Sequence, residues 1–317
     1  MAAALIPRAL TERVAQQCAV SVAGSCALIC AALRETYGDA LQGILFYGSC
    51  ARGEDMEGGI ADIFVIVDSY RNVYGKRHLA YLNARLPPNV FYREIPANGA
   101  VIRVKLAVIS RADFAGGILR WFHSYLWGRF AQPARILHAR DEAVRAELHR
   151  LLAQAVLTLL RTTIPALPDK SCAAETVWTR ALSLSYSAEF RPEPESKAAD
   201  LVRHNLADYT ALLEAALPAL GEILRREGEN SYRPLYDTQA AAAALSRWRR
   251  RRVLGRILSV LRLAKAVLTF TNSVDYAAWK IGRHTGVEIE VTPRLRRYPL
   301  LFGWRVFLKL VKQGVLR

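Results

Sequence analysis

The apolar residues follow a strand-like pattern in one part of the chain and a helical spacing in the rest. In the first third of the chain, the runs Leu41 to Tyr47 and Ile60 to Val67 are almost wholly apolar, which is typical of buried strands. Residues 101–109 alternate instead, with apolar side chains at the even positions and Arg103 and Lys105 between them. This alternation predicts a third strand whose two cations share the face turned away from the core.

The remaining apolar positions recur at helical spacing. They predict helices over residues 11–37, 74–84, 112–126, 141–163, 199–217 and 240–267, a linker at 228–232 and a short strand at 287–291. Prolines at 165 and 168 separate the two halves. We therefore expect an α+β fold, in which a mixed-sheet domain (residues 1–164) precedes a mostly helical domain (165–298) and a terminal helix (299–317).

The terminal stretch has its own pattern. Arg305, Lys309 and Lys312 are spaced i, i+4 and i+7, so they line one helical face, and Trp304 and Phe307 belong to the apolar remainder. This pattern predicts an amphipathic helix in the headgroup region of a membrane. The alternative is a terminal helix that packs on the core.

Charge and composition narrow the classes of function. The formal net charge of +16 requires an anionic partner, which is nucleic acid, an anionic membrane or an anionic substrate. The five cysteines and six histidines lack metal-binding spacing, so no zinc site is expected. No apolar run reaches the roughly 20 residues of a membrane-spanning helix. Glu12 and the absence of a serine-rich stretch favour an amphipathic first helix over a targeting sequence.

The candidate chemistry lies between the first two predicted strands. Gly48 and Ser49 end the first strand, and Asp62 opens the second. A glycine lets the backbone approach a triphosphate, a serine hydroxyl and N–H can hold a phosphate oxygen, and a carboxylate can hold the Mg²⁺ that bridges phosphates. The pattern predicts a nucleotidyltransferase site, although a glycine-serine turn between core strands would look similar.

The position two residues after Asp62 is apolar. Most nucleotidyltransferases have a second carboxylate there, on the same face of the strand, but this chain has Phe64. Asp68 shares that face six residues on, roughly 20 Å away, which is too far to share a metal. The site is therefore either inactive or of a kind that needs fewer carboxylates.

Several motifs in order favour the second option. The segments Tyr47-Gly48-Ser49 and Asp62-Ile63-Phe64-Val65 resemble motifs of the mitochondrial translocator assembly and maintenance family, whose members are phosphatidate cytidylyltransferases that make CDP-diacylglycerol. The resemblance continues through Asn98-Gly99, Lys105 to Ser110, Trp121, Tyr125, Gly128-Arg129, Pro133 and Leu184 to Arg191. In that family, too, the second carboxylate position is apolar. The chain departs from the family at Cys50, where the family has glycine, and in a histidine-containing stretch that residues 69–81 do not reproduce.

The resemblance implies a polymerase-β-like mixed sheet, a winged-helix-like second part, and the transfer of CMP from CTP to phosphatidate. Gly48 and Ser49 would hold the β- and γ-phosphates, Asp62 would hold Mg²⁺ or Mn²⁺, and Lys105 would place a charge near the α-phosphate. Arg129 and Arg191 would bind pyrophosphate or the lipid headgroup, and Tyr186 would contact the nucleotide or orient Arg191. For Arg129, Arg191 and Tyr186 a structural role is equally compatible with the sequence. Arg129 would then cap a helix C-terminus, and Tyr186 would be a core aromatic.

Two other functions stay open at this point. One is a nucleotidyltransferase that acts on RNA, with the arginines of residues 247–256 on phosphates; the other is a degenerate nucleotide-binding scaffold at a membrane. The apolar residue 64 and the aromatic terminal helix argue against RNA, so we expect CTP, phosphatidate and an anionic membrane as partners and no nucleic acid, and leave a homo-oligomer open. We expect peripheral association with the cytoplasmic face of a bacterial inner membrane, or alternatively with the matrix side of the mitochondrial one.

Overall fold

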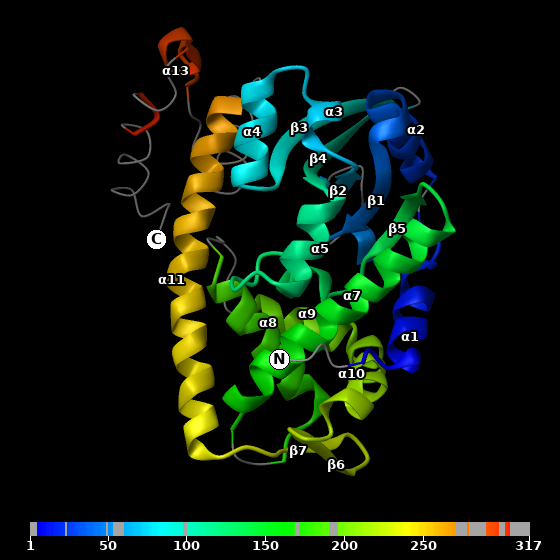
Figure 1. The fold of residues 1–317 in the computed structure, drawn as a ribbon, viewed down its shortest axis with the longest axis vertical. Coiled ribbons are helices and arrows are strands. Elements are labelled where there is room, and N and C mark those ends of the chain that lie inside the picture. The colour runs from blue at the N-terminus through cyan, green and yellow to red at the C-terminus, as the bar shows by residue number, and fades with distance from the viewer. Residues whose placement is uncertain are drawn as a thin grey trace.

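A five-stranded mixed sheet is the frame of the first half of the protein (Figure 1). The computed structural model describes residues 5–22, 24–48, 50–52, 60–97, 100–168, 171–189, 196–269, 278, 290–297 and 302–304. The strands are β1 (Leu41–Tyr47), β2 (Ala61–Val67), β3 (Asn89–Ala97), β4 (Ala100–Ser110) and β5 (Arg135–Ala139), in the spatial order β3-β4-β2-β1-β5. Strands β2 and β4 are parallel, and every other neighbouring pair is antiparallel.

Both faces of the sheet are buried, which explains the continuous apolar runs of β1 and β2. One face, with Ile63, Val104 and Leu106, packs against α2 (Ser25–Tyr37) in the smaller core. The other face, with Phe64 and Ala107, belongs to the larger core. The expectation that Arg103 and Lys105 face away from a core is therefore only partly right, because the same face of β4 continues into buried Ala107.

Helices of the first half cover the sheet. They are α1 (Arg8–Cys18), α2, α3 (Tyr70–Val73), α4 (Arg77–Arg85), α5 (Arg111–Leu119), α6 (Trp127–Phe130) and α7 (Glu142–Thr163). The Ser110 hydroxyl and the Asp141 carboxylate cap the N-termini of α5 and α7. The predicted helix over residues 11–37 is two helices, and the one over 112–126 ends at Leu119, where a loop leads into α6.

The second half is mostly helical. It contains α8 (Ala174–Ser187), α9 (Lys197–His204), α10 (Leu206–Leu220), the hairpin β6 (Leu224–Gly228) and β7 (Ser231–Pro234), α11 (Thr238–Thr269) and α13 (Pro293–Arg297). The winged-helix-like part that the resemblance implies stays a prediction. The predicted helix over 199–217 divides at Asn205, and Pro218 lies inside α10 rather than ending it. The predicted linker is the hairpin turn, and the predicted strand at 287–291 lies largely outside the described residues.

One hydrophobic cluster joins the two halves. It contains Phe64 and Phe114 from the sheet side, Leu157 from α7, and Trp178 and Tyr209 from the helical side. The domain boundary at residues 164/165 stays a prediction. Helix α11 runs along one long edge of the molecule, past α4 at one end and towards the hairpin at the other (Figure 1). Among the described residues, no helix is long and apolar enough to cross a bilayer.

Candidate active site

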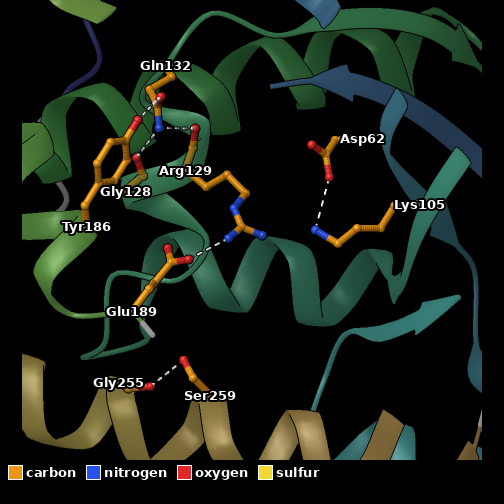
Figure 2. A network of polar contacts seen from close by, with 9 residues as sticks. All are labelled: Asp62, Lys105, Gly128, Arg129, Gln132, Tyr186, Glu189, Gly255 and Ser259. Atoms are coloured by element: carbon orange, nitrogen blue, oxygen red, sulfur yellow. Dashed lines mark hydrogen bonds and ion pairs between the residues drawn. The ribbon is translucent and has the colours of Figure 1, made fainter. Parts of the chain in front are cut away.

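The centre of the candidate site is an ion pair between two neighbouring parallel strands. Asp62 of β2 and Lys105 of β4 are register partners, so their side chains leave the sheet on the same face (Figure 2). Lys105 Nζ lies 3.1 Å from Asp62 Oδ1, and each side chain is 30% exposed. The Asp62 carboxylate raises the pKa of Lys105 above its ordinary value. Lys105 is therefore a fixed positive charge that solvent and a ligand can reach.

Gly48 lies against this carboxylate. Its φ is +86°, a backbone conformation that residues with a Cβ rarely adopt. A Cβ at position 48 would lie 2.9 Å from Asp62 Oδ2. The glycine is required both by the turn after β1 and by the space that the carboxylate occupies. The structure therefore brings Gly48, Asp62 and Lys105 together, and their roles stay predictions.

Phe64 occupies the position of the missing second carboxylate, and it lies in the core. Its side chain is fully buried and its ring contacts those of Tyr47, Phe114 and Phe130, with centroid distances of 5.4, 6.5 and 4.9 Å. Asp68 lies beyond the far end of β2 and bonds to Asn72. No group of three His, Cys, Asp or Glu side chains within the described ranges is arranged to hold a metal ion. The role of Asp62 as a metal ligand stays a prediction.

A second, more deeply buried ion pair lies beside the first. Arg129 of α6 and Glu189, just after α8, are 2.7 Å apart, with side chains only 11% and 8% exposed. The Arg129 guanidinium also lies over the rings of Tyr125 and Tyr47, at 4.4 and 5.5 Å. Arg129 therefore approaches the site through Tyr47, the register partner of Asp62, while its charge is already balanced by Glu189.

Tyr186 supports the turn that carries Arg129. Its hydroxyl donates to Gln132 Oε1 at 2.8 Å, and the Gln132 amide nitrogen donates to the carbonyl oxygens of Gly128 and Arg129 (Figure 2). A Cβ on Gly128 would lie 2.0 Å from the Ser185 hydroxyl oxygen, so α6 and α8 are in close contact. These contacts give Tyr186 a positioning role, and a direct contact with nucleotide stays a prediction.

Several predicted site residues lie outside the described part of the chain. These are Ser49, Arg191, Arg305, Phe307, Lys309 and Lys312. Trp304 is described, and its side chain is exposed. Their proposed roles stay predictions.

Sequence reasoning missed the contribution of helix α11. Arg262 donates to the Pro87 carbonyl oxygen at 2.9 Å, and its guanidinium lies 4.0 Å from the centre of the Tyr125 ring. Arg129 lies over the same ring, so Tyr125 connects the two arginines. Lys265 donates to oxygens of Asn83, Leu86 and Pro88. A signal was present: residues 251, 255, 258, 262 and 265 follow helical spacing, so three of the cations share one face with Gly255. Glu189 could also have been found, as the only carboxylate of the motif Leu184 to Arg191.

A mixed sheet with a glycine, a carboxylate and a lysine at the junction of its central strands has the form of a nucleotidyltransferase fold. A sequence profile of the family described as "Phosphatidate cytidylyltransferase, mitochondrial" matches residues 68–256, which is more than half of the chain. The chain belongs to this family. Lys105, Arg129 and Tyr186 lie within the matched range, whereas Gly48 and Asp62 precede it.

Two individual comparisons accompany this match. The mitochondrial phosphatidate cytidylyltransferase of Drosophila melanogaster is 27% identical over 213 residues, which cover 59% of this chain and 60% of the fly protein. The matched region thus spans about 60% of that relative's length. A nucleotidyltransferase-like protein from Exiguobacterium sibiricum 255-15 aligns over 92% of both chains with 13% identity and a TM-score of 0.28, which carries no argument here. The family description and the fly protein's name both contain the word mitochondrial, and neither supports the expected bacterial membrane.

Proposed function

We propose that the protein is a phosphatidate cytidylyltransferase, which joins phosphatidate to the α-phosphate of CTP. A phosphatidate oxygen forms a bond to the α-phosphorus, the bond from that phosphorus to the bridging oxygen breaks, and pyrophosphate leaves with the electron pair. The observation that carries the proposal is the Gly48–Asp62–Lys105 cluster, in a chain that belongs to this family.

The side chains supply positioning and charge, which are the main requirements of phosphoryl transfer. Lys105 stays protonated beside Asp62 and would bind an α-phosphate oxygen, where negative charge develops in the transition state. Gly48 leaves open backbone for the triphosphate, and Ser49 would donate to it. Arg129 would contact pyrophosphate or the lipid phosphate while Glu189 fixes its direction.

A single carboxylate fits one kind of metal site. Mg²⁺ commonly binds one or two carboxylates and takes its other ligands from substrate phosphates and water. Asp62 would hold Mg²⁺ (or Mn²⁺) in this way together with CTP oxygens. When bound, such an ion neutralises phosphate charge and stabilises the leaving pyrophosphate.

The nature of the acceptor explains why Phe64 is tolerated. An enzyme that transfers a nucleotide to a hydroxyl must remove its proton, and extra carboxylates assist. A phosphomonoester has a second pKa of about 6 and is mostly dianionic at neutral pH. Phosphatidate therefore needs no general base at position 64, which is buried among aromatic rings.

The proposed setting is a membrane surface, because phosphatidate is a lipid. The name of the fly protein supports a mitochondrial setting, and within it we propose the matrix side of the inner membrane. The terminal segment with Trp304, Arg305, Phe307, Lys309 and Lys312 would bind anionic lipid. Removal of residues 300–317 should weaken flotation with anionic vesicles and leave CTP binding intact, and unchanged flotation would contradict this role.

One labelling experiment tests the proposed reaction. Purified protein is incubated with CTP labelled in the cytidine, Mg²⁺, and either phosphatidate vesicles or RNA. We expect label in the lipid fraction alone. Label in RNA would show an RNA nucleotidyltransferase instead, and retention of CTP without label transfer to either acceptor would show a degenerate scaffold.

A further inference from the structure

The outward face of helix α11 is apolar along its middle. Val253, Ile257 and Val260 are 62%, 52% and 56% exposed, and Leu254 and Leu261 beside them are exposed as well. Their spacing of i, i+4 and i+7 places the first three residues in one line along the helix. Soluble proteins rarely expose a contiguous apolar stripe of this kind unless it is a binding surface.

Arginines line one edge of this stripe. At 100° per residue, Arg249, Arg252 and Arg256 fall along that edge, whereas Arg250 falls within the apolar arc, between the angular positions of Ile257 and Leu261. All four are exposed. The sequence of α11 contains no Asp or Glu over its 32 residues, so nothing on the helix neutralises them. We call these four arginines, with Val253, Leu254, Ile257, Val260 and Leu261, the outer stripe.

The opposite face of α11 is fixed to the protein. A Cβ on Gly255 would lie 2.0 Å from the Ala188 carbonyl oxygen, next to Glu189. Arg251 donates to the Phe122 carbonyl oxygen, and Arg262 to that of Pro87. These contacts hold the helix with the outer stripe turned to solvent. The inner face of the helix, with Gly255, lies next to Glu189 of the Arg129–Glu189 pair (Figure 2).

We propose that the outer stripe is a second membrane-contacting surface, which lies in the plane of an anionic bilayer independently of the terminal segment. An apolar line beside a row of arginines matches acyl chains below the headgroups and anionic phosphates around them. Nucleic acid would use the arginines but gain nothing from the apolar line, and a second copy of this basic chain would bring like charge to the same surface. Charge complementarity therefore selects the bilayer.

This surface would orient the site as well as recruit the enzyme. Only helix α11 itself separates the stripe from the site. On the inner side of this helix, Arg262 lies over the Tyr125 ring, and Arg129 lies over the same ring. A bilayer bound at the stripe would lie one helix diameter, roughly 10 Å, from these groups. The inference rests on the proposed function in so far as a lipid substrate gives the contact its purpose, but binding can be measured without turnover.

The test uses two full-length variants and vesicles without phosphatidate. In one, Arg249, Arg250, Arg252 and Arg256 are replaced by Gln; in the other, Val253, Ile257 and Val260 are replaced by Gln, which is a better helix former than either. The probe is flotation with phosphatidylcholine vesicles containing phosphatidylglycerol. We expect partitioning to fall by roughly a hundredfold for the arginine variant and by about tenfold for the apolar variant.

A charge-matched control separates the stripe from net charge. Arg8, Arg71, Arg150 and Arg225 are exposed and lie outside α11, so their joint replacement by Gln removes the same charge elsewhere. This control should float nearly as well as the parent protein. Equal losses in the control and in the arginine variant would overturn the proposal, because the effect would then be one of overall charge.

Two further measurements cover the other occupants and the proposed function. If the apolar variant floats normally but has a lower molar mass than the parent protein in light scattering, the stripe is a contact between copies. If the arginine variant binds RNA more weakly while its flotation is unchanged, the stripe is a nucleic-acid surface. Either result overturns the proposal. Turnover of CTP with a water-soluble short-chain phosphatidate should be equal in all three variants and the parent. If no protein turns this substrate over, the proposed function fails while the flotation result still decides the surface.

Discussion

The protein holds buried or half-buried cations in two ways. At the candidate site, Lys105 and Arg129 each face a carboxylate, Asp62 and Glu189. On α11, the hydrogen bonds of Arg251 and Arg262 go to carbonyl oxygens, and both guanidiniums lie over aromatic rings. Lys265 likewise donates to two carbonyl oxygens and an amide oxygen.

The cations that face a carboxylate and those on α11 differ in the direction in which their pKa values are shifted. Asp62 raises the pKa of Lys105, whereas burial lowers the pKa of Arg251 to about 10 and that of Lys265 to about 7. A cation beside a carboxylate keeps its charge for an incoming phosphate, and a metal ion can share the carboxylate. A cation surrounded by carbonyl oxygens is partly compensated for its burial and serves to fix a helix. The first arrangement suits chemistry and the second suits architecture.

The largest expected effect comes from removing the carboxylate of the first ion pair. Replacement Asp62→Asn keeps the side-chain shape but removes the proposed metal ligand and the partner of Lys105, so turnover of CTP and phosphatidate should fall by roughly a thousandfold. The melting temperature should change little because both side chains are partly exposed. The matched control is Asp68→Asn, at the far end of the same strand, which should retain full activity. Normal turnover by Asp62→Asn would refute the assignment of the site.

The buried pair should matter most for stability. Replacement Glu189→Gln leaves the Arg129 charge buried without its counter-charge, which should lower the free energy of unfolding by about 3 kcal/mol in urea titrations. The exposed pair Arg8–Glu12 provides the comparison, since Glu12→Gln should have no measurable effect. Equal effects of the two variants would show that burial does not distinguish them.

A smaller change tests the glycine beside Asp62. Replacement Gly48→Ala places a Cβ against the carboxylate in a backbone conformation that alanine disfavours, so we expect a loss of about 2 kcal/mol in stability together with reduced turnover. Gly75 lies outside the left-handed region, and a Cβ added there would meet no heavy atom within 4 Å, so Gly75→Ala should be neutral or slightly stabilising. An unchanged Gly48→Ala protein would mean that the turn after β1 differs from the one described.

The second group of cations should give the stability a pH dependence. The folded-state pKa of Lys265 is about 7, below its ordinary value of 10.5, so between these values the unfolded chain binds the extra proton. The stability of the parent protein relative to Lys265→Met should therefore rise from about pH 7 to about pH 10, by at most about 1.4 kcal/mol per pH unit. Urea titrations of both proteins across this range measure the slope. A difference that does not vary with pH would show that the buried lysine keeps an ordinary pKa.

The sequence predicts the elements with a strong local pattern and misses the contacts between residues that are far apart in the chain. Strands β1, β2 and β4 are predicted well because they are buried and strongly patterned, and Gly48, Asp62 and Lys105 follow from their ends and their register. Strand β3, at the sheet edge, has a mixed pattern with Arg93 and Glu94 exposed, and the sequence does not predict it. The partners of Arg129 and the contacts of α11 join residues 60 to 182 positions apart, which no local pattern specifies.

Phe64 also restricts what this protein can become. A second acidic ligand at this position, through Phe64→Asp, would replace an aromatic ring by an ionised group among Tyr47, Phe114 and Phe130, at a cost of several kcal/mol before any benefit to metal binding. A single substitution therefore leads to an unstable chain rather than to a two-carboxylate catalyst. The aromatic cluster therefore disfavours a second carboxylate at this position and, under the proposed function, limits the protein to acceptors that are already ionised.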